Sequence, residues 1–347
     1  MKVVPNAMKR THVVILGGGF GGVYTALEFE RRRDPDFEVT MVSVDNFFLF
    51  TPMLHEVAAS DLHLTHIVNP MRKILRHVNF INAEVQNIDL ANRTITILHG
   101  FDRHNHVLEF NHLVFALGSV TNFYKIPGLE ERAITMKSLG DAIDLRNTLI
   151  ARLEEANPDC ATKNREPLLT FVVAGGGFAG VETVGSIKDF LHDALPYYPN
   201  LKPEMIKTVL VHPGDFVLPE LGEGLGRYAW TRQGKRPYGS GRISGLWALG
   251  DCAMVPDSTG GFCPPTAQHA ARGGKVLASN IIAGTRREPL RAFRFKTLGL
   301  LASIGQRTGV ARILGVNFSG FLAIARQGRS PCSRLLAGDG IFLGLQV

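Results

Sequence analysis

The chain has little cysteine, and its cysteines are not spaced for metal binding or dithiol chemistry. Only four occur in 347 residues, namely Cys160, Cys252, Cys263 and Cys332. None forms a CxxC or CxxxxC pair, the arrangements that indicate zinc sites or thiol exchange. So few cysteines exclude a disulfide framework and favour a reducing compartment. We therefore expect no metal site and no disulfide-rich secreted fold.

Long apolar runs are also missing. No window of about 18 apolar residues occurs, which is the length that a membrane-spanning helix needs. The first ten residues, MKVVPNAMKR, lack the apolar core of a signal peptide. We expect a protein that does not span a membrane and is cytoplasmic or bound peripherally to the cytoplasmic face of the cell membrane.

The positive charge is not concentrated in any one segment. The formal net charge is +7, but the basic residues are scattered, and the one short run is at residues 31–33. That run falls at the end of a predicted helix, where cations are favoured. Nucleic acid is therefore not an expected partner. The composition, 45% hydrophobic and 20% charged, is typical of a globular chain and excludes general disorder.

Glycine is plentiful, and its most informative spacing lies in THVVILGGGFGG at 11–22. An apolar run stops abruptly at Gly17, Gly19 and Gly22. This pattern predicts a buried strand that turns directly into a helix. Gly17 permits the tight turn, Gly19 lets a pyrophosphate reach bare backbone, and Gly22 lets the helix pack closely on the sheet. The helix N–H groups would face the phosphates.

The same pattern recurs in LLTFVVAGGGFAGVE at 168–182, with Gly175, Gly177 and Gly180. Two such turns predict two bound dinucleotides. The fold class expected is α/β, with two Rossmann-like dinucleotide-binding domains of three layers each. The second domain is expected to be incomplete, because residues 213–244 are too few for the missing strands and crossovers. Exposed strand edges there would favour pairing with another chain, as in a homodimer.

Periodicity and turn residues predict the remaining elements. Helices are expected at 20–32, 70–76, 138–156 (opened by a capping box of Ser138 and Asp141) and 264–282. Further strands are expected at 37–44, 112–118, 206–211 and 245–253, with an antiparallel meander at 84–89, 93–98 and 107–110. Residues 293–304 and 308–314 are expected to be paired strands, and the tail after residue 318 has no pattern.

Polar residues at the ends of the predicted strands are candidates for cofactor contacts. The ribose hydroxyls would bond either to Asp45 or, more weakly, to Ser43. Asp251 could accept a hydrogen bond from a cofactor hydroxyl or cap the segment that follows. Glu182 is either a proton or quinone relay or an acid in the first turn of its helix, where the helix dipole favours it. His269 is expected on the surface of its helix.

Taken together, these segments resemble the two-dinucleotide flavoproteins and, within them, the type II NADH dehydrogenase family. The resemblance covers most of residues 8–323. It is carried by VVILGGGFGGV (13–23), LFTPMLHEVA (49–58), LVFALG (113–118), VVAGGGFAGVE (172–182), LPELGE (218–223), and ALGDCAMVP with PPTAQHAARGGK (248–275).

The resemblance implies FAD and NADH as cofactors, a quinone as electron acceptor, and hydride transfer from NADH to the flavin. It implies FAD-binding segments at 8–135 and 240–316, an NAD(P)H-binding domain at 136–239, and an atypical tail at 317–347. The catalytic candidates are Glu182, near the nicotinamide, and Gln268, beside the flavin ring where quinone enters. The candidate cofactor-binding residues are Gly17, Gly19, Phe20, Gly22, Asp45, Val85, Ala116, Gly118, Gly175, Gly177, Gly180, Gly250, Asp251 and Ala267.

Several residues depart from the family pattern. His212 stands where the family often has an acid, so NADH and NADPH both remain open, and Arg272 stands where a second glutamine is frequent. The family's membrane-anchoring C-terminal helices are expected to be absent. Two alternatives therefore stay open: a flavin-binding remnant without turnover, and a soluble NAD(P)H reductase with another acceptor. Cys160 as the nucleophile of a sulfide:quinone oxidoreductase is a weaker reading.

Overall fold

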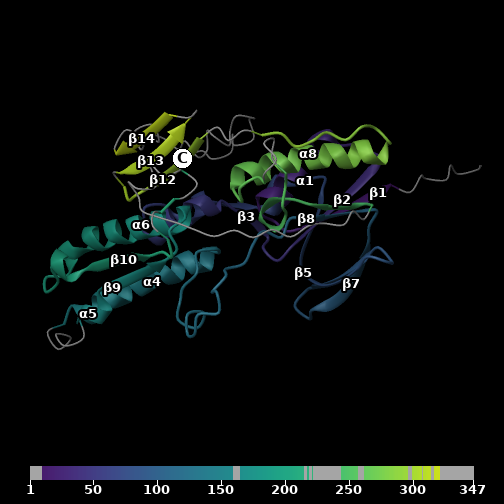
Figure 1. Cartoon of the computed structure of the whole chain (residues 1–347). Helices are drawn as coiled ribbons and strands as arrows, with labels where there is room; N and C mark the ends of the chain where they lie inside the picture. The colour runs from purple at the N-terminus through teal and green to yellow at the C-terminus, as the bar shows by residue number, and fades with distance from the viewer. Residues whose placement is uncertain are drawn as a thin grey trace, which may run out of the picture. The chain divides into compact units, whose positions relative to one another are not determined.

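The protein is described by a computed structural model that covers residues 10–158, 165–214, 217–218, 221, 244–256, 262–295, 299–306, 308–313 and 316–320. The chain divides into two compact units, each built from separate segments. Unit 1 comprises Met1–Leu49, Val68–Val120 and Gly239–Lys296, and unit 2 comprises Phe50–Ile67, Thr121–Tyr238 and Thr297–Val347. In Figure 1, unit 1 contains the purple and dark blue strands with the green helix α8, and unit 2 contains the teal helices and the yellow strands.

Unit 1 is organised around a seven-stranded sheet in the order β11-β8-β1-β2-β5-β6-β7. Pairing is parallel from β11 through β8, β1 and β2 to the start of β5, and antiparallel between β5, β6 and β7. The strands are β1 (Thr11–Leu16), β2 (Phe37–Ser43), β5 (Asn79–Asp89), β6 (Thr94–His99), β7 (His104–Glu109), β8 (His112–Phe115) and β11 (Leu246–Ala248).

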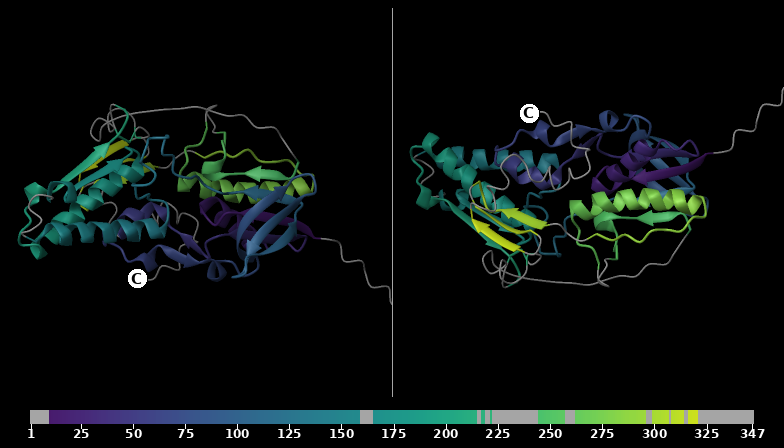
Figure 2. Two further views of the ribbon diagram at one scale, coloured as in Figure 1. Left: turned by 90° about the horizontal axis from the view of Figure 1, so that it is seen from below. Right: turned by 90° about the horizontal axis from the view of Figure 1, so that it is seen from above.

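Two long helices of unit 1, α1 (Phe20–Arg32) and α8 (Ala267–Thr285), lie side by side (Figure 1, Figure 2). Glycine makes their close approach feasible. A Cβ atom at Gly274 would lie 2.8 Å from the backbone nitrogen of Thr25 and 2.9 Å from the carbonyl oxygen of Gly21. Unit 1 also contains α3 (Met71–Ile74), the short antiparallel pair β3 (Phe47–Leu49) and β4 (Val68–Pro70), and the 3₁₀ turn η7 (Gly250–Cys252).

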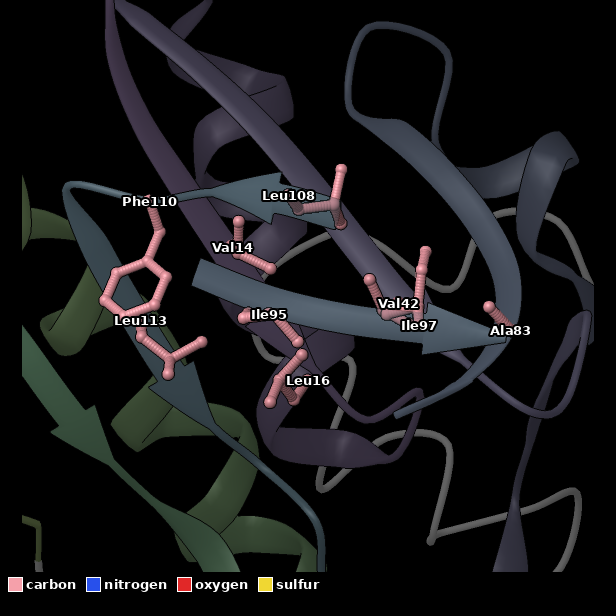
Figure 3. Close-up of a cluster of buried hydrophobic side chains, with 9 residues drawn as sticks. All are labelled: Val14, Leu16, Val42, Ala83, Ile95, Ile97, Leu108, Phe110 and Leu113. Carbon is pink, nitrogen blue, oxygen red and sulfur yellow. The ribbon is translucent and has the colours of Figure 1, made fainter. Parts of the chain in front are cut away.

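The antiparallel strands cover one face of the parallel strands and form the core of unit 1 with them (Figure 3). Alternate residues of β1 point toward this core, because successive side chains of a strand point to opposite faces. Ile95 and Ile97 of β6 are fully buried against them. The cluster consists of Val14, Leu16, Val42, Ala83, Ile95, Ile97, Leu108, Phe110 and Leu113.

Unit 2 contains α4 (Leu139–Ala156), α5 (Arg165–Leu168), α6 (Phe178–Ala194) and the parallel two-stranded sheet of β9 (Thr170–Ala174) and β10 (Lys207–Val211). The Ser138 side chain accepts a hydrogen bond from the backbone N–H of Asp141, and the Asp141 side chain completes the capping box that starts α4. The apolar sides of α4 and α6 meet in a core that includes Leu149, Leu153, Ile187 and Leu191.

The remaining elements of unit 2 surround the other end of α6. They are α2 (Leu54–Ala58), which packs against α4 and α6, and the antiparallel sheet of β12 (Gly299–Ser303), β13 (Gly309–Ile313) and β14 (Val316–Gly320). Short 3₁₀ turns occur at η1 (Thr51–Met53), η2 (Leu64–His66), η4 (Leu195–Tyr197) and η5 (Pro203–Met205). A Cβ atom at Gly185 would lie 2.4 Å from the backbone nitrogen of Gly305, so α6 touches the β12–β13 turn directly.

The predicted α/β class is confirmed, but several bounds were wrong. The first meander strand begins at Asn79, not at residue 84, because its first four residues pair in parallel with β2 before the strand turns to β6. Residues 293–295 are not a strand. Residues 316–320 form β14, although the chain after residue 318 was expected to have no pattern. Cys160 and Cys332 lie outside the described residues.

Candidate functional site

The first glycine turn joins β1 to α1 with the geometry that its spacing predicts. Gly17 has a φ of +107°, and its N–H donates to the Val42 carbonyl oxygen at 2.9 Å. A Cβ atom at Gly22 would lie 2.0 Å from the Gly17 carbonyl oxygen, so this position requires glycine. At Gly19 an added Cβ would meet nothing within 4 Å. Gly19 also begins α1 with no side-chain cap, which leaves the helix N–H groups able to bind phosphate.

The second glycine turn, between β9 and α6 in unit 2, has the same geometry. Gly175 has a φ of +117°, and its N–H donates to the Val211 carbonyl oxygen at 2.8 Å. A Cβ atom at Gly180 would nearly coincide with the carbonyl oxygen of Gly175, at 1.8 Å, whereas at Gly177 it would meet nothing within 4 Å. Two turns of the same construction therefore lie in one chain, one in each unit.

The residue at the end of the second strand differs between the two units. In unit 1, Ser43 is buried at the end of β2, and its hydroxyl lies 2.6 Å from the position of a Cβ atom at Gly18. Its Oγ also accepts a hydrogen bond from the N–H of Asp45 at 3.3 Å, while the Asp45 residue is exposed. In unit 2, His212 occupies the equivalent place, and its Nδ1 accepts a hydrogen bond from the N–H of Gly176 at 3.1 Å.

The ends of β8 and β11 bring the other unit 1 candidates together. The hydroxyl of Ser119 donates to Oδ2 of Asp251 at 3.3 Å, so Asp251 lies beside the segment that follows β8. Ala116 is buried, and its carbonyl oxygen lies 2.3 Å from the Cβ position of Gly17. Gly118 and Gly250 both have a positive φ, of +69° and +74°. Ala116 thus lies directly against the first glycine turn, and the other residues lie at the ends of β8 and β11, the edge of the sheet where the doubly wound topology predicts ligand binding.

Two candidate residues of unit 1 take part in the apolar packing. Phe20, the first residue of α1, is buried, with its ring edge to face with Phe48 at a centroid distance of 5.0 Å. Val85 pairs with Ile97 across the sheet and packs against the unit 1 core.

The start of α8 carries Ala267 and Gln268, both partly buried. Thr266 caps this helix by accepting a hydrogen bond from the N–H of His269. The expectation that His269 lies on the helix surface was wrong, because its ring is buried against Phe295 at a centroid distance of 5.1 Å. This burial, with the nearby charge of Arg272, lowers the pKa of His269 and favours its neutral form.

Glu182 lies in the second turn of α6 within a group of titratable side chains. Its Oε2 is 3.7 Å from Nδ1 of His55, and its Oε1 accepts a hydrogen bond from the N–H of Ser303 at 3.3 Å. Burial, together with the neighbouring charge of Glu56, raises the pKa of Glu182 to about 8 against the opposing effect of the hydrogen bond from the Ser303 N–H. Burial lowers the pKa of His55 to about 4. A neutral histidine therefore lies beside a carboxyl group that keeps its proton at pH 7.

Sequence reasoning identified Glu182 but missed His55, Glu56 and Ser303. The signal available for the first two was the pair His-Glu within the apolar segment LFTPMLHEVA, where ionisable residues are unusual. No local signal pointed to Ser303. Within the residues that the structure describes, no group of three or more His, Cys, Asp or Glu side chains could hold a metal ion. None of the helices described is long and apolar enough to cross a membrane.

Comparison with known proteins gives a family match. A family model described as pyridine nucleotide-disulphide oxidoreductase matches residues 11–237. The chain is 28% identical to a probable NADH dehydrogenase of Dictyostelium discoideum, covering 89% of this chain and 82% of that protein. It is 26% identical to the type II NADH:quinone oxidoreductase of Mycobacterium tuberculosis, covering 91% and 82%.

Other relatives are longer. An external alternative NAD(P)H-ubiquinone oxidoreductase of Arabidopsis thaliana is 34% identical over 61% of this chain but only 38% of its own length. Among solved structures, NDH2 from Plasmodium falciparum in complex with NADH has the same fold, with a TM-score of 0.77 and 18% identity over 90% of this chain and 92% of that one.

Proposed function

The chain belongs to the pyridine nucleotide-disulphide oxidoreductase family, and on this premise we propose that it is an FAD-dependent NADH:quinone oxidoreductase of the type II class. The observation that carries the proposal is the repeated glycine turn. Each turn leaves open space at its middle glycine, Gly19 or Gly177, and an uncapped helix N-terminus. Two such turns suit two dinucleotides, one bound permanently and one exchanging. The relatives named as NADH dehydrogenases support the same assignment.

We assign FAD to unit 1. The N–H groups after Gly19 would hold the pyrophosphate, Asp251 would accept a hydrogen bond from a hydroxyl of the ribityl chain, and Asp45 or Ser43 would bond the adenosine ribose. When bound, FAD supplies a two-electron acceptor for the hydride of NADH and a donor to the quinone. The chain's own contribution is to fix the position of the cofactor and to exclude water. Segments 8–135 and 240–316 form this FAD-binding domain in our proposal.

We assign the nicotinamide dinucleotide to the turn at Gly177, in a domain spanning 136–239. Glu182 lies in the second turn of α6, and the family resemblance implies a position near the nicotinamide. The place after β10 that frequently carries an acid for the ribose 2′-hydroxyl is occupied by His212. A neutral or cationic ring there would not repel a 2′-phosphate, so NADPH is an acceptable second substrate.

The proposal also includes the electron acceptor and the location of the protein in the cell. We place the quinone near Ala267 and Gln268 at the start of α8. We also propose a peripheral position on the cytoplasmic face of the cell membrane, since the relatives act on quinones by name. A homodimer would cover strand edges of unit 2.

The test is spectroscopic. The purified protein should be yellow, and NADH added without oxygen should bleach the flavin absorbance, which a quinone analogue should then restore. Gly19→Ala should fold but bind little FAD, whereas Gly177→Ala should stay yellow and resist bleaching by NADH. Both glycines leave room for the added methyl group, so each variant is the control for the other.

The outcomes separate the candidate functions. Protein that is colourless even with excess flavin contradicts the whole assignment. A yellow protein that NADH does not bleach is a flavin-binding remnant. The sheet of unit 2, which has only two described strands, would explain why such a protein does not react with NADH. Bleaching that quinones do not reverse indicates a reductase with another acceptor.

A further inference from the structure

Three histidines lie on one face of the β6–β7 hairpin of unit 1, close to its turn. His99 ends β6 and is paired directly with His104, the first residue of β7. His106, two residues further along β7, is paired with Ile97. Successive residues of a strand point to opposite faces, so the three histidines lie on the same face as Ile97 and Leu108 of the unit 1 core (Figure 3). The row of core residues therefore continues into histidines at the end of the hairpin.

The rings of His99 and His104 face each other through the same type of nitrogen. Their two Nε2 atoms are 2.8 Å apart, and the ring centroids are separated by 4.1 Å at an interplanar angle of 65°. The other nitrogen of His104 has a different partner, because Nδ1 lies 2.7 Å from Oδ1 of Asp102. The ring of His106 lies edge to face with that of His99 at a centroid distance of 6.0 Å, so His106 is outside the close pair.

The carboxylate of Asp102 determines which nitrogen of His104 carries the proton. The hydrogen bond from His104 lowers the pKa of Asp102, so this carboxyl group is ionised at neutral pH. An ionised carboxylate only accepts hydrogen bonds. Nδ1 of His104 is therefore the donor and, in the neutral ring, Nε2 carries the lone pair. A carboxylate that accepts from the outer nitrogen of a histidine in this way is the usual partner of histidines that bind a metal ion.

The histidine pair is open to solvent, and the basic side chain of the turn is held away from it. The side chains of His104 and Asp102 are 50% and 74% exposed. Arg103, which lies between them in the chain, forms an ion pair with Glu84 of β5 at 2.8 Å. Glu84 is paired with Leu98, whose side chain points to the face opposite the histidines, so the ion pair lies on that opposite face. A dissolved cation can therefore reach the two Nε2 atoms without meeting the guanidinium group.

We propose that His99 and His104 form a binding site for a divalent transition-metal ion such as zinc, coordinated through the two Nε2 atoms with water in its other positions. Imidazole nitrogen binds zinc at about 2.0–2.1 Å, so two such nitrogens on a tetrahedral ion lie about 3.3 Å apart. The separation of 2.8 Å must therefore widen by about 0.5 Å, which small rotations of the two rings supply. His99 then carries its proton on Nδ1.

A site with two protein ligands binds more weakly than a structural zinc site with four. The cysteine spacing gave no indication of a metal site, and the described residues contain no larger group of His, Cys, Asp or Glu that could hold one, so binding depends on this pair. We expect a Kd on the order of 1–100 µM, because half of the ligands of a structural site are present. The bound ion would join β6 to β7 beside the turn that begins at Gly100, and would hold the end of the hairpin together.

The experiment measures zinc binding to the purified full-length chain at neutral pH, by competition with a chromophoric zinc indicator. His99→Gln and His104→Gln each remove one of the two ligands and should abolish this binding. Asp102→Asn keeps the size of the side chain but holds Nδ1 of His104 less strongly, and it should weaken binding about tenfold. Zinc should also slow amide hydrogen exchange at residues 99–104 of the unchanged protein, because the ion joins the two strands.

The matched control is His106→Gln, which changes an exposed histidine on the same face of the hairpin but outside the close pair, and should leave the affinity unchanged. The inference is overturned if the unchanged protein binds no zinc in this range, or if His99→Gln and His104→Gln bind it as tightly as the unchanged protein. It is also overturned if His106→Gln loses as much affinity as these two variants. Neither flavin, NADH nor quinone takes part in the measurement, so its outcome is independent of the proposed function.

Discussion

The proton held by Glu182 should make the stability of unit 2 depend on pH, and the substitution Glu182→Gln should remove that dependence. The pKa of this carboxyl is raised from an ordinary 4.5 to about 8. A raised pKa means that the folded state binds the proton more tightly than the unfolded state. The contribution to stability is therefore complete below pH 4.5, is lost as pH rises through about 8, and stays absent above that value.

The shift gives the size of the effect. Each pKa unit corresponds to about 1.4 kcal/mol, so ionising this carboxyl group in the folded protein costs roughly 4–5 kcal/mol. Glutamine has no proton to lose. The free energy of unfolding of Glu182→Gln should match the unchanged protein near pH 4.5 and exceed it by an amount that grows through neutral pH and levels off above pH 8.

The assay is urea denaturation at a series of pH values, followed by circular dichroism. Comparing the two proteins at each pH cancels the opposite contribution of His55, whose lowered pKa adds stability as pH rises from about 4 to 6.5. The control is Glu84→Gln, which changes an exposed carboxyl group paired with Arg103. A difference between Glu182→Gln and the unchanged protein that is flat across this range would refute the reasoning.

Three further substitutions test the fold. Gly22→Ala should destabilise unit 1 by about 1–3 kcal/mol or more, because its methyl group would overlap the Gly17 carbonyl oxygen, and flavin release should accompany the loss in thermal melts. Ile97→Ala empties a fully buried position in the unit 1 core, so urea denaturation should show a loss of about 2–5 kcal/mol. Ser138→Ala removes the cap of α4 and should cost about 1 kcal/mol, seen as faster amide exchange near Asp141; an unchanged exchange rate would contradict the capping role.

The sequence predicted best where a single stretch of chain determines its own structure. Both glycine turns were found because a strand, a tight turn and a helix follow one another without interruption, and the hydrogen bonds to Val42 and Val211 bear out that geometry. The start of α4 was found for the same reason, since Ser138 and Asp141 are three residues apart.

Features that depend on distant contacts were predicted less well. The extra residues at the start of β5 are strand because β2 lies beside them. The segment that became β14 has no strand pattern of its own and is specified by pairing with β13. His269 is buried because Phe295, far along the chain, covers it. The group around Glu182 combines residues 55, 182 and 303, which no local pattern connects.

The short parallel sheet of unit 2 should unfold before the seven-stranded sheet of unit 1. Val172, Val209 and Val211, which share one side of this sheet, are 61%, 41% and 53% exposed, whereas parallel strands in most proteins are covered on both sides. Because this side of the sheet is exposed to water, local unfolding of β9 and β10 costs less free energy. On gentle heating, β9 and β10 should therefore separate and become cleavable by a protease while the seven-stranded sheet, with Val13 and Ile15 fully shielded, is still intact.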